Sequence, residues 1–289
     1  MTAATPVATL RPGQDVSGIY ACTRKDRLVS RAGTPYLALE LRDKTGALPA
    51  RAFRDADVLA GRFERGDVVR VAGRVERFRD ELMVDVKAVA RVEPVDVDPA
   101  AFLPVAYRDL DELDGFLEHL ADQVTDAGFA ALLAHLLGDD ALRAAIRRAP
   151  CTRGGHHAYL GGLLEHTVAV ATLVTETCVL HPRLEHDLLL TAALVHDLGK
   201  TREFAYGAEI GLTDEGRLLG HLVLGQQLLE PYLTGLDDAH RVALLHCVLC
   251  HHGPDAAPGR RYGSPEAVAL HRLNALDASV KGVLEHGLT

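Results

Sequence analysis

The chain has 289 residues, 48% of them hydrophobic and 25% charged, and its formal net charge is −9. This length and composition indicate an ordinary globular protein with one large domain or two. The N-terminal residues contain no basic segment followed by an apolar one, and the longest apolar runs are far shorter than a membrane span. These features argue against a secreted or membrane-embedded protein, and we expect a cytoplasmic location.

The net charge is unevenly distributed along the chain. It is +2 over residues 1–98 and −11 over residues 99–289. An acidic second part argues against a large surface that coats nucleic acid there, although its carboxylates could help to retain cations.

The cysteines are odd in number and widely spread, which is unlike a secreted disulfide framework and predicts reduced thiols. They are Cys22, Cys151, Cys178, Cys247 and Cys250. The run Cys247-Val248-Leu249-Cys250-His251 matches the string that attaches c-type haem. Because this run lies inside a helical apolar pattern, we interpret its cysteines as buried free thiols instead.

The first part of the chain reads as strands, because short segments alternate between apolar and polar residues or are rich in β-branched ones. The predicted strands are residues 16–22, 36–42, 47–53, 68–75 and 81–89. Five short strands in a segment of this length predict a small closed barrel, and the OB-fold is the commonest five-stranded candidate.

Charged and aromatic residues are expected in two connections of this barrel. We place Arg24, Lys25, Arg27 and Arg31 in the first connection and Arg77, Phe78 and Arg79 in the fourth. OB-folds hold oligonucleotides with these two connections, using cations for phosphates and an aromatic ring for base stacking. The alternative is that these are solvated surface residues balanced by nearby acids. Tyr36 and Phe53 could also stack on bases, or pack inside the barrel.

A proline-bracketed acidic segment at residues 93–99 marks a domain boundary. We therefore predict an OB-fold domain over residues 1–92, a linker over 93–104 and an all-α domain over 105–289. Beyond the linker the apolar residues recur with helical spacing, and a short helix is expected over residues 140–148.

The helical part offers imidazole or carboxylate groups beside the apolar stripe of five successive segments. A single buried histidine is more often a packed core residue, but five such segments together favour a shared site. The last segment begins with Ser264 as its N-cap and Pro265 at its first position. The residues concerned are His156, His157, His166, His196, Asp197, His221, His251, His252, Asn274 and Asp277.

This order of residues resembles the HD superfamily of metal-dependent phosphohydrolases, in which a histidine, a His-Asp doublet and a later aspartate bind metal. The extra histidines resemble the variant that holds two metals. Five motifs together are similar to YhaM-type 3′→5′ exoribonucleases, which join an OB-fold to an HD domain. They are His156 to Thr167, His196-Asp197-Leu198-Gly199-Lys200, Gly220-His221, His251-His252-Gly253 and Tyr262-Gly263-Ser264-Pro265.

The resemblance implies a metal-dependent 3′→5′ exonuclease that hydrolyses single-stranded RNA, and also DNA, by attack of a metal-bound hydroxide. It implies two divalent ions, a single-stranded nucleic acid partner and a chain that can form a homo-oligomer. Imidazoles predominate over carboxylates among the donors, which favours Mn²⁺, Fe²⁺, Co²⁺, Ni²⁺ or Zn²⁺ over Mg²⁺. The expected metal ligands are His166, His196, Asp197, His221, His251, His252 and Asp277.

Asp197 has two oxygens and is expected to bridge the two ions. Lys200 either stabilises charge on phosphorus in the transition state or neutralises carbonyl groups at a helix end. Asn274 stands where the HD pattern has an acid, so either Asn274 or Asp277 completes the first metal site. The resemblance also assigns substrate contacts to Arg153, His156, His157, Arg261, Tyr262 and Ser264.

Two other functions fit the sequence. One is an HD phosphohydrolase that acts on a small or cyclic nucleotide, with the OB-fold in a regulatory role. The other is a non-catalytic protein that binds single strands and uses the histidine cluster for structure. Histidines beyond the minimal metal set are hard to explain without chemistry, which disfavours the second.

Overall fold

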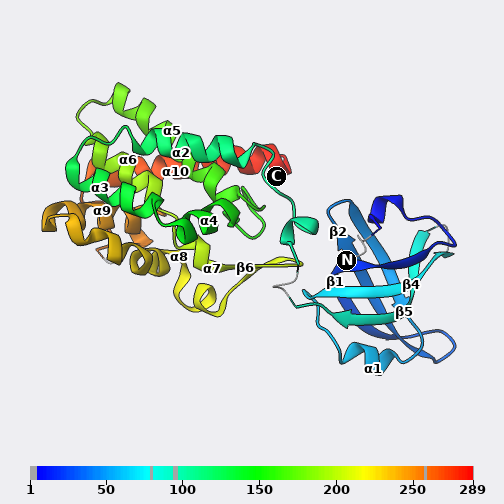
Figure 1. The fold of residues 1–289 in the computed structure, drawn as a ribbon. Helices are drawn as coiled ribbons and strands as arrows, with labels where there is room; N and C mark the ends of the chain where they lie inside the picture. The colour runs from blue at the N-terminus through cyan, green and yellow to red at the C-terminus, as the bar shows by residue number, and fades with distance from the viewer. Residues whose placement is uncertain (1–4, 79–80, 94–96, 257–258, 289) are drawn as a thin grey trace. The chain divides into compact units, whose positions relative to one another are not determined.

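The computed structural model describes residues 5–78, 81–93, 97–256 and 259–288. Its contacts divide the chain into two compact units (Figure 1). The first unit is Met1–Pro104 with Tyr206–Ile210, and the second is Val105–Ala205 with Gly211–Thr289. Each unit has its own hydrophobic core.

The first unit is a closed five-stranded barrel with the strand order β1-β2-β3-β5-β4, which confirms the predicted OB-fold architecture. All neighbouring strands are antiparallel except β3 and β5, which pair in parallel at Ala50 and Val84. The short helix α1 packs against the barrel interior through Leu59 and Ala60. The elements are β1 Asp15–Val29, β2 Pro35–Asp43, β3 Gly46–Ala52, α1 Ala56–Ala60, β4 Val68–Phe78 and β5 Glu81–Arg91.

Strand β1 is longer than the sequence pattern suggested. It pairs with β4 over its first part and with β2 over its second, and the register shifts between Cys22 and Arg24. This irregularity bends the strand so that it belongs to both sides of the closed barrel. The prediction that Arg24, Lys25 and Arg27 lie in the first connection is therefore wrong, because all three are strand residues. Arg77 and Phe78, predicted in the fourth connection, are likewise the last residues of β4.

The second unit is helical, and its helix starts follow from capping. Asp109, Asp126 and Asp139 each accept hydrogen bonds from two backbone N–H groups of the following first turn, which satisfies donors that a helix cannot satisfy itself. The helices are α2 Leu110–Ala121, α3 Ala127–Leu137, α4 Asp140–Arg148, α5 Gly162–Leu180, α6 His186–Val195, α7 Lys200–Glu203, α8 Asp214–Leu229, α9 Asp238–Cys250 and α10 Pro265–His286. A two-stranded sheet of β6 Phe204–Tyr206 and β7 Ile210–Leu212 follows α7.

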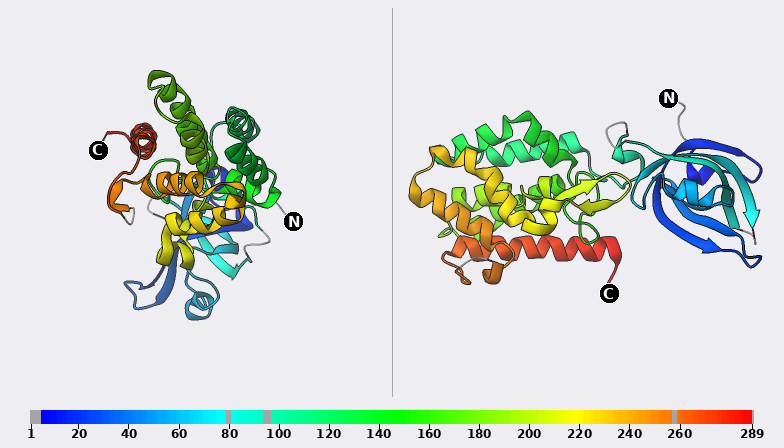
Figure 2. Two further views of the ribbon diagram at one scale, coloured as in Figure 1. Left: turned by 90° about the vertical axis from the view of Figure 1, so that its left-hand side faces the viewer. Right: turned by 90° about the horizontal axis from the view of Figure 1, so that it is seen from below.

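Helices α5 and α6 form the centre of this unit. Every residue of α6 from Leu188 to Val195 is buried, and α10 packs against α5, α6 and α9 along one side of the unit (Figure 2). By length and composition alone α5 could cross a membrane, whereas the apolar runs of the sequence predicted no such span. Half of its apolar window is buried inside the protein, so α5 acts as a core helix.

An ion-pair cluster joins α2 to α4. Arg143 and Arg147 both donate to Asp114, at 2.7 Å for each closest pair, and Asp114 is 8% exposed. Burial opposes ionisation of Asp114, but hydrogen bonds from the two arginines outweigh it and lower the pKa of this carboxyl.

We predict that Asp114→Asn destabilises the protein by about 2 kcal/mol, because two partly buried guanidinium groups lose a charged acceptor. Folding lowers the pKa of Asp114. The contribution of Asp114 to the free energy of unfolding is therefore complete above the unfolded pKa of about 3.9, and it is lost as the pH falls below that value toward the folded pKa. Urea unfolding between pH 3 and 7 measures both effects. Asp111→Asn, which removes an exposed partner of Arg147, is the control and should cost about 0.5 kcal/mol.

Candidate functional site

Two sets of side chains converge on the two oxygens of Asp197, which follows α6 and is 2% exposed. On one side, His166 Nε2 and His196 Nε2 lie 3.5 Å and 3.3 Å from Oδ2. On the other side, His251 Nε2 and His221 Nε2 lie 3.3 Å and 3.6 Å from Oδ1. We call the groups around Oδ2 the first donor set and the groups around Oδ1 the second donor set.

His252 extends the second donor set. Its Nε2 lies 2.9 Å from Nε2 of His221, and its ring lies against that of His251 with the centroids 4.2 Å apart. These side chains come from α5, the turn after α6, α8 and the end of α9, so helices far apart in the sequence supply one centre.

The four central imidazoles are held in one tautomer. Nδ1 of His196 and of His251 donates to a backbone carbonyl, at 2.7 Å and 2.6 Å. Nδ1 of His166 faces Asp277 at 2.6 Å, and Nδ1 of His221 faces Glu203 at 3.2 Å. A neutral imidazole that donates through Nδ1 carries a bare lone pair on Nε2. The Nε2 lone pairs of all four rings can therefore bind a cation together with the oxygens of Asp197.

In the second donor set these contacts bring acceptor atoms together without a donor between them. Asp197 Oδ1 and His251 Nε2 are buried, and neither has a hydrogen-bond partner among the described residues. Burial lowers the pKa of His166, and it lowers the pKa of His251 to about 4, so both rings are neutral near pH 7. Neutral imidazoles beside an ionised carboxylate are the donors that divalent transition metals bind, and the residues present fit such ions.

Two glycines allow these elements to meet. A Cβ on Gly199 would lie 1.9 Å from the carbonyl oxygen of His221, so only glycine permits this approach between the turn after Asp197 and α8. Gly220 has a φ of 70° and breaks α8 just before His221. The break leaves the His221 N–H free to donate to Glu203 at 3.1 Å. Since the ring of His221 also meets Glu203, this carboxylate fixes both the backbone and the side chain of His221.

Lys200 lies inside the centre. Its ammonium is 2.7 Å from Asp197 Oδ2 and 3.3 Å from the Cys151 sulfur, and the residue is 5% exposed. Burial opposes its charge, but the carboxylate of Asp197 outweighs burial and raises the pKa of Lys200. The charge of Lys200 in turn holds the pKa of Asp197 well below its usual range, against the effect of burial. The alternative that Lys200 neutralises helix-end carbonyls is wrong, because its contacts are with these two side chains.

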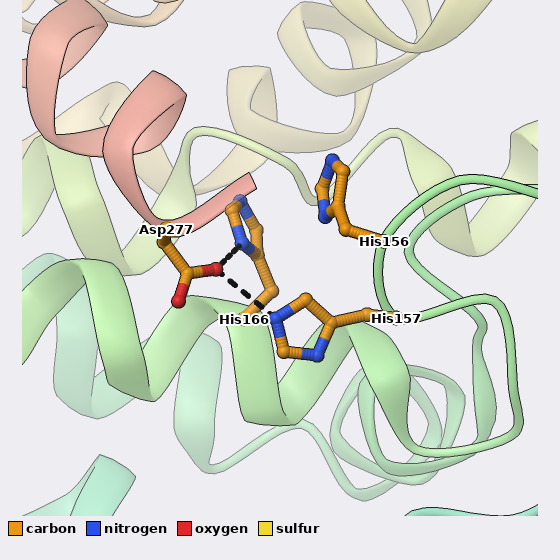
Figure 3. Close-up of side chains that lie close together, drawn as sticks. All are labelled: His156, His157, His166 and Asp277. Carbon is orange, nitrogen blue, oxygen red and sulfur yellow. Dashed lines mark hydrogen bonds and ion pairs between the residues drawn. The ribbon is translucent and has the colours of Figure 1, made fainter. Parts of the chain in front are cut away.

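Asn274 and Asp277 lie on opposite nitrogens of the His166 ring. Asp277 Oδ2 faces Nδ1 of His166 and also accepts from Nε2 of His157 at 3.0 Å (Figure 3). Asn274 Oδ1 faces Nε2 of His166 at 3.0 Å, on the side of the first donor set. His157 is 1% exposed, and its other nitrogen meets the Tyr159 hydroxyl. The prediction that His157 contacts the substrate is therefore wrong, because its side chain is buried and both of its ring nitrogens are occupied.

The other predicted substrate contacts are unevenly supported. His156 is half-buried, its ring lies 5.2 Å from that of His166, and burial lowers its pKa to about 4. Arg153 and Arg261 are exposed, and Tyr262 lies against the His271 ring. The Ser264 hydroxyl accepts from the Ala267 N–H and caps α10, as predicted, so it serves the helix start.

The barrel presents an aromatic surface beside the β1–β2 and β4–β5 connections. The Tyr36 and Phe53 rings stack with centroids 5.0 Å apart, and Phe53 and Phe78 are 44% and 45% exposed. The Arg51 guanidinium lies over the rings of both Tyr36 and Phe78, at 5.6 Å and 4.8 Å. Together with Arg31 they line a surface cavity of about 430 Å³. We call Tyr36, Arg51, Phe53 and Phe78 the aromatic platform.

The predicted basic contacts of the barrel have different outcomes. Lys25 turns inward, where its ammonium donates to the Phe63 carbonyl and to Glu64, and its side chain is only 10% exposed. It is therefore not available to a phosphate. Arg24 is exposed but paired with Asp26, and Arg77 is exposed at the end of β4. Arg79 lies outside the described residues.

Sequence reasoning missed two residues of these sites. Arg51 lies in an alternating strand with no motif around it, and only its register beside β2 could have indicated that it joins the aromatic rings. Glu203 lies in no predicted pattern, and its role follows from the sharp break at Gly220, which a sequence does not reveal.

Comparisons with known proteins agree with this architecture. A family model of the HD domain matches residues 163–279, and one of an OB-fold nucleic acid binding domain matches residues 21–91. The chain is thus a two-domain protein in which an OB-fold precedes an HD domain.

The chain is also homologous to proteins named 3'-5' exoribonuclease YhaM. It is 28% identical over 273 residues to that of Listeria welshimeri, covering 88% of this chain and 83% of the relative. It is 25% identical over 277 residues to that of Halalkalibacterium halodurans, covering 93% of this chain and 84% of the relative. Among solved structures, the second OB-fold domain of replication protein A from Methanococcus maripaludis is 19% identical, covering 31% of this chain and 94% of that chain, with a TM-score of 0.26.

We predict that Mn²⁺ stabilises the wild-type protein, by about 2.7 kcal/mol at a hundred times the dissociation constant, because it binds only the folded donor sets. Asp197→Asn should lose most of this gain, since both sets share Asp197. Thermal unfolding with and without Mn²⁺ measures the effect. Each variant is compared with its own metal-free state, and Asp238→Asn on the surface of α9 serves as control. Equal metal stabilisation of wild type and Asp197→Asn would contradict the shared role.

Proposed function

We propose that this chain is a metal-dependent 3′→5′ exonuclease that hydrolyses single-stranded RNA. The observation that carries the proposal is the buried cluster of acceptor atoms around Asp197, joined in one chain to an OB-fold with an exposed aromatic platform. The names of the relatives support the same activity and direction.

The chain's own residues would act in the following way. His166 and His196 on one side and His221, His251 and His252 on the other would hold two divalent ions, with Asp197 between them. Ions bound there supply Lewis acidity to a phosphodiester and lower the pKa of a water molecule. Lys200 keeps Asp197 ionised in a buried position and adds positive charge beside the reacting phosphate.

The donor atoms also suggest which ion to test first. Five imidazoles and one carboxylate favour a transition metal over Mg²⁺, and we propose Mn²⁺. All five cysteines are free and buried, which is consistent with the reducing cytoplasm that we propose as the location.

The aromatic platform supports a polymer substrate over a small nucleotide. Exposed rings and a guanidinium between them offer faces on which successive bases stack, without a requirement for sequence. A small cyclic nucleotide needs no such surface on a second domain. We therefore place the incoming strand on Tyr36, Arg51, Phe53 and Phe78, with Arg31 near its phosphates.

We predict that the wild-type protein with Mn²⁺ converts a 5′-labelled single-stranded RNA into a descending ladder on a denaturing gel. Asp197→Asn should leave the strand intact, because both donor sets lose their shared charge. The same reaction is run with DNA and with a cyclic dinucleotide. An intact RNA strand together with rapid turnover of the cyclic dinucleotide would replace this proposal with the small-nucleotide one.

We predict that Phe53→Ala with Phe78→Ala weakens binding of single-stranded RNA by about 1–3 kcal/mol per lost stacking contact. Fluorescence anisotropy with the inactive Asp197→Asn protein measures binding without cleavage. Tyr107→Ala removes an exposed aromatic residue elsewhere in the chain and is the matched control. Unchanged affinity of the double variant would remove the platform from substrate capture.

A further inference from the structure

The amide of Asn274 has a fixed orientation. Its Nδ2 donates to the backbone carbonyl of His251 at 3.2 Å, which turns its Oδ1 toward Nε2 of His166. His166 Nε2 is itself an acceptor, because its Nδ1 faces the carboxylate of Asp277. Two acceptors 3.0 Å apart in a buried position need a cation beside them. Asn274 Oδ1 is therefore a member of the first donor set.

Asp277 has a different place. Its Oδ2 already accepts from His166 Nδ1 and from His157 Nε2, so the lone pairs of this oxygen are directed at two ring N–H groups. The other nitrogen of His166 points away from Asp277 (Figure 3). His157 is in turn held by Tyr159, whose hydroxyl donates to Glu165. Asp277 is thus a positioning residue that sets the tautomer and direction of the His166 ring.

The two donor sets consequently differ in charge. The first set has neutral donors from His166, His196 and Asn274, and its carboxylate oxygen is shared with the ammonium of Lys200 at 2.7 Å. The second set contains Asp197 Oδ1, which lacks a hydrogen-bond partner in the described part of the chain. A divalent ion in the first set therefore meets less negative charge than one in the second.

We propose that the two donor sets bind metal unequally, and that the first set takes up its ion tightly only together with a phosphate group, which supplies the negative charge that Asn274 lacks. This inference rests on the proposed metal-dependent function, but it concerns metal binding and not cleavage. A phosphate group in the site would then have two roles, because it would complete the first metal site and also be the group that the centre hydrolyses.

Equilibrium dialysis against Mn²⁺, with and without inorganic phosphate, tests the proposal. The wild-type protein should bind one ion tightly without phosphate, and phosphate should raise the affinity for a second ion about tenfold. Asn274→Asp should bind both ions without phosphate, since it adds a carboxylate at the donor position. Two equally tight ions in phosphate-free wild type, or unchanged binding by Asn274→Asp, would overturn the proposal.

Asp277→Asn is the matched change three residues along α10. It should lower the affinity for the second ion by about tenfold, because the His166 ring loses its alignment. The number of ions bound with phosphate should stay at two. The visible spectrum of the Co²⁺-loaded protein reports the donor atoms. It should shift in Asn274→Asp and keep its wild-type position in Asp277→Asn, and the reverse pattern would make Asp277 the ligand.

Thermal unfolding without metal checks that both variants fold. If Asn274→Asp does not fold, Asn274→Ala removes the same donor without adding charge, and it should lose the phosphate-dependent ion. These readouts are independent of RNA cleavage, so an inactive protein that shows the predicted metal binding would refute the proposed function and leave this inference standing.

Discussion

The centre depends on hydrogen bonds made on the far side of its imidazole rings. Backbone carbonyls of Ala193 and Val248, and the carboxylates of Asp277 and Glu203, each take up one Nδ1. Because those nitrogens are occupied, the Nε2 lone pairs face Asp197 in a buried position where they repel one another. The folded chain tolerates this cost because α5, α6, α9 and α10 pack tightly around it.

The same arrangement explains why one carboxylate is central. Asp197 is ionised although it is buried, since the ammonium of Lys200 offsets the loss of water. Its two oxygens face different donor sets, so removing it affects both at once. The described residues of the barrel include no comparable buried charge. We propose that its exposed rings around Arg51 act by stacking, which tolerates many base sequences.

The sequence was enough to predict the OB-fold and helical architecture, because alternation and helical spacing are local properties that the structure keeps. It also indicated the histidines and Asp197, which lie beside apolar stripes. It did not predict that Lys25 turns inward or that β1 continues through Arg27, because strand pairing around a closed barrel depends on distant residues. Asn274 and Asp277 share a helix face, and only the tertiary position of His166 separates their roles.

The contact at Gly199 has a consequence for how the protein can vary. There the turn that carries Asp197 meets α8 backbone to backbone, without intervening side chains. Substitutions among the surrounding aliphatic residues can therefore accumulate over evolutionary time and repack the interior, while the spacing between Asp197 and His221 is held by main-chain atoms. Lineages that diverge widely in their cores should retain a glycine at this position together with an unaltered catalytic geometry.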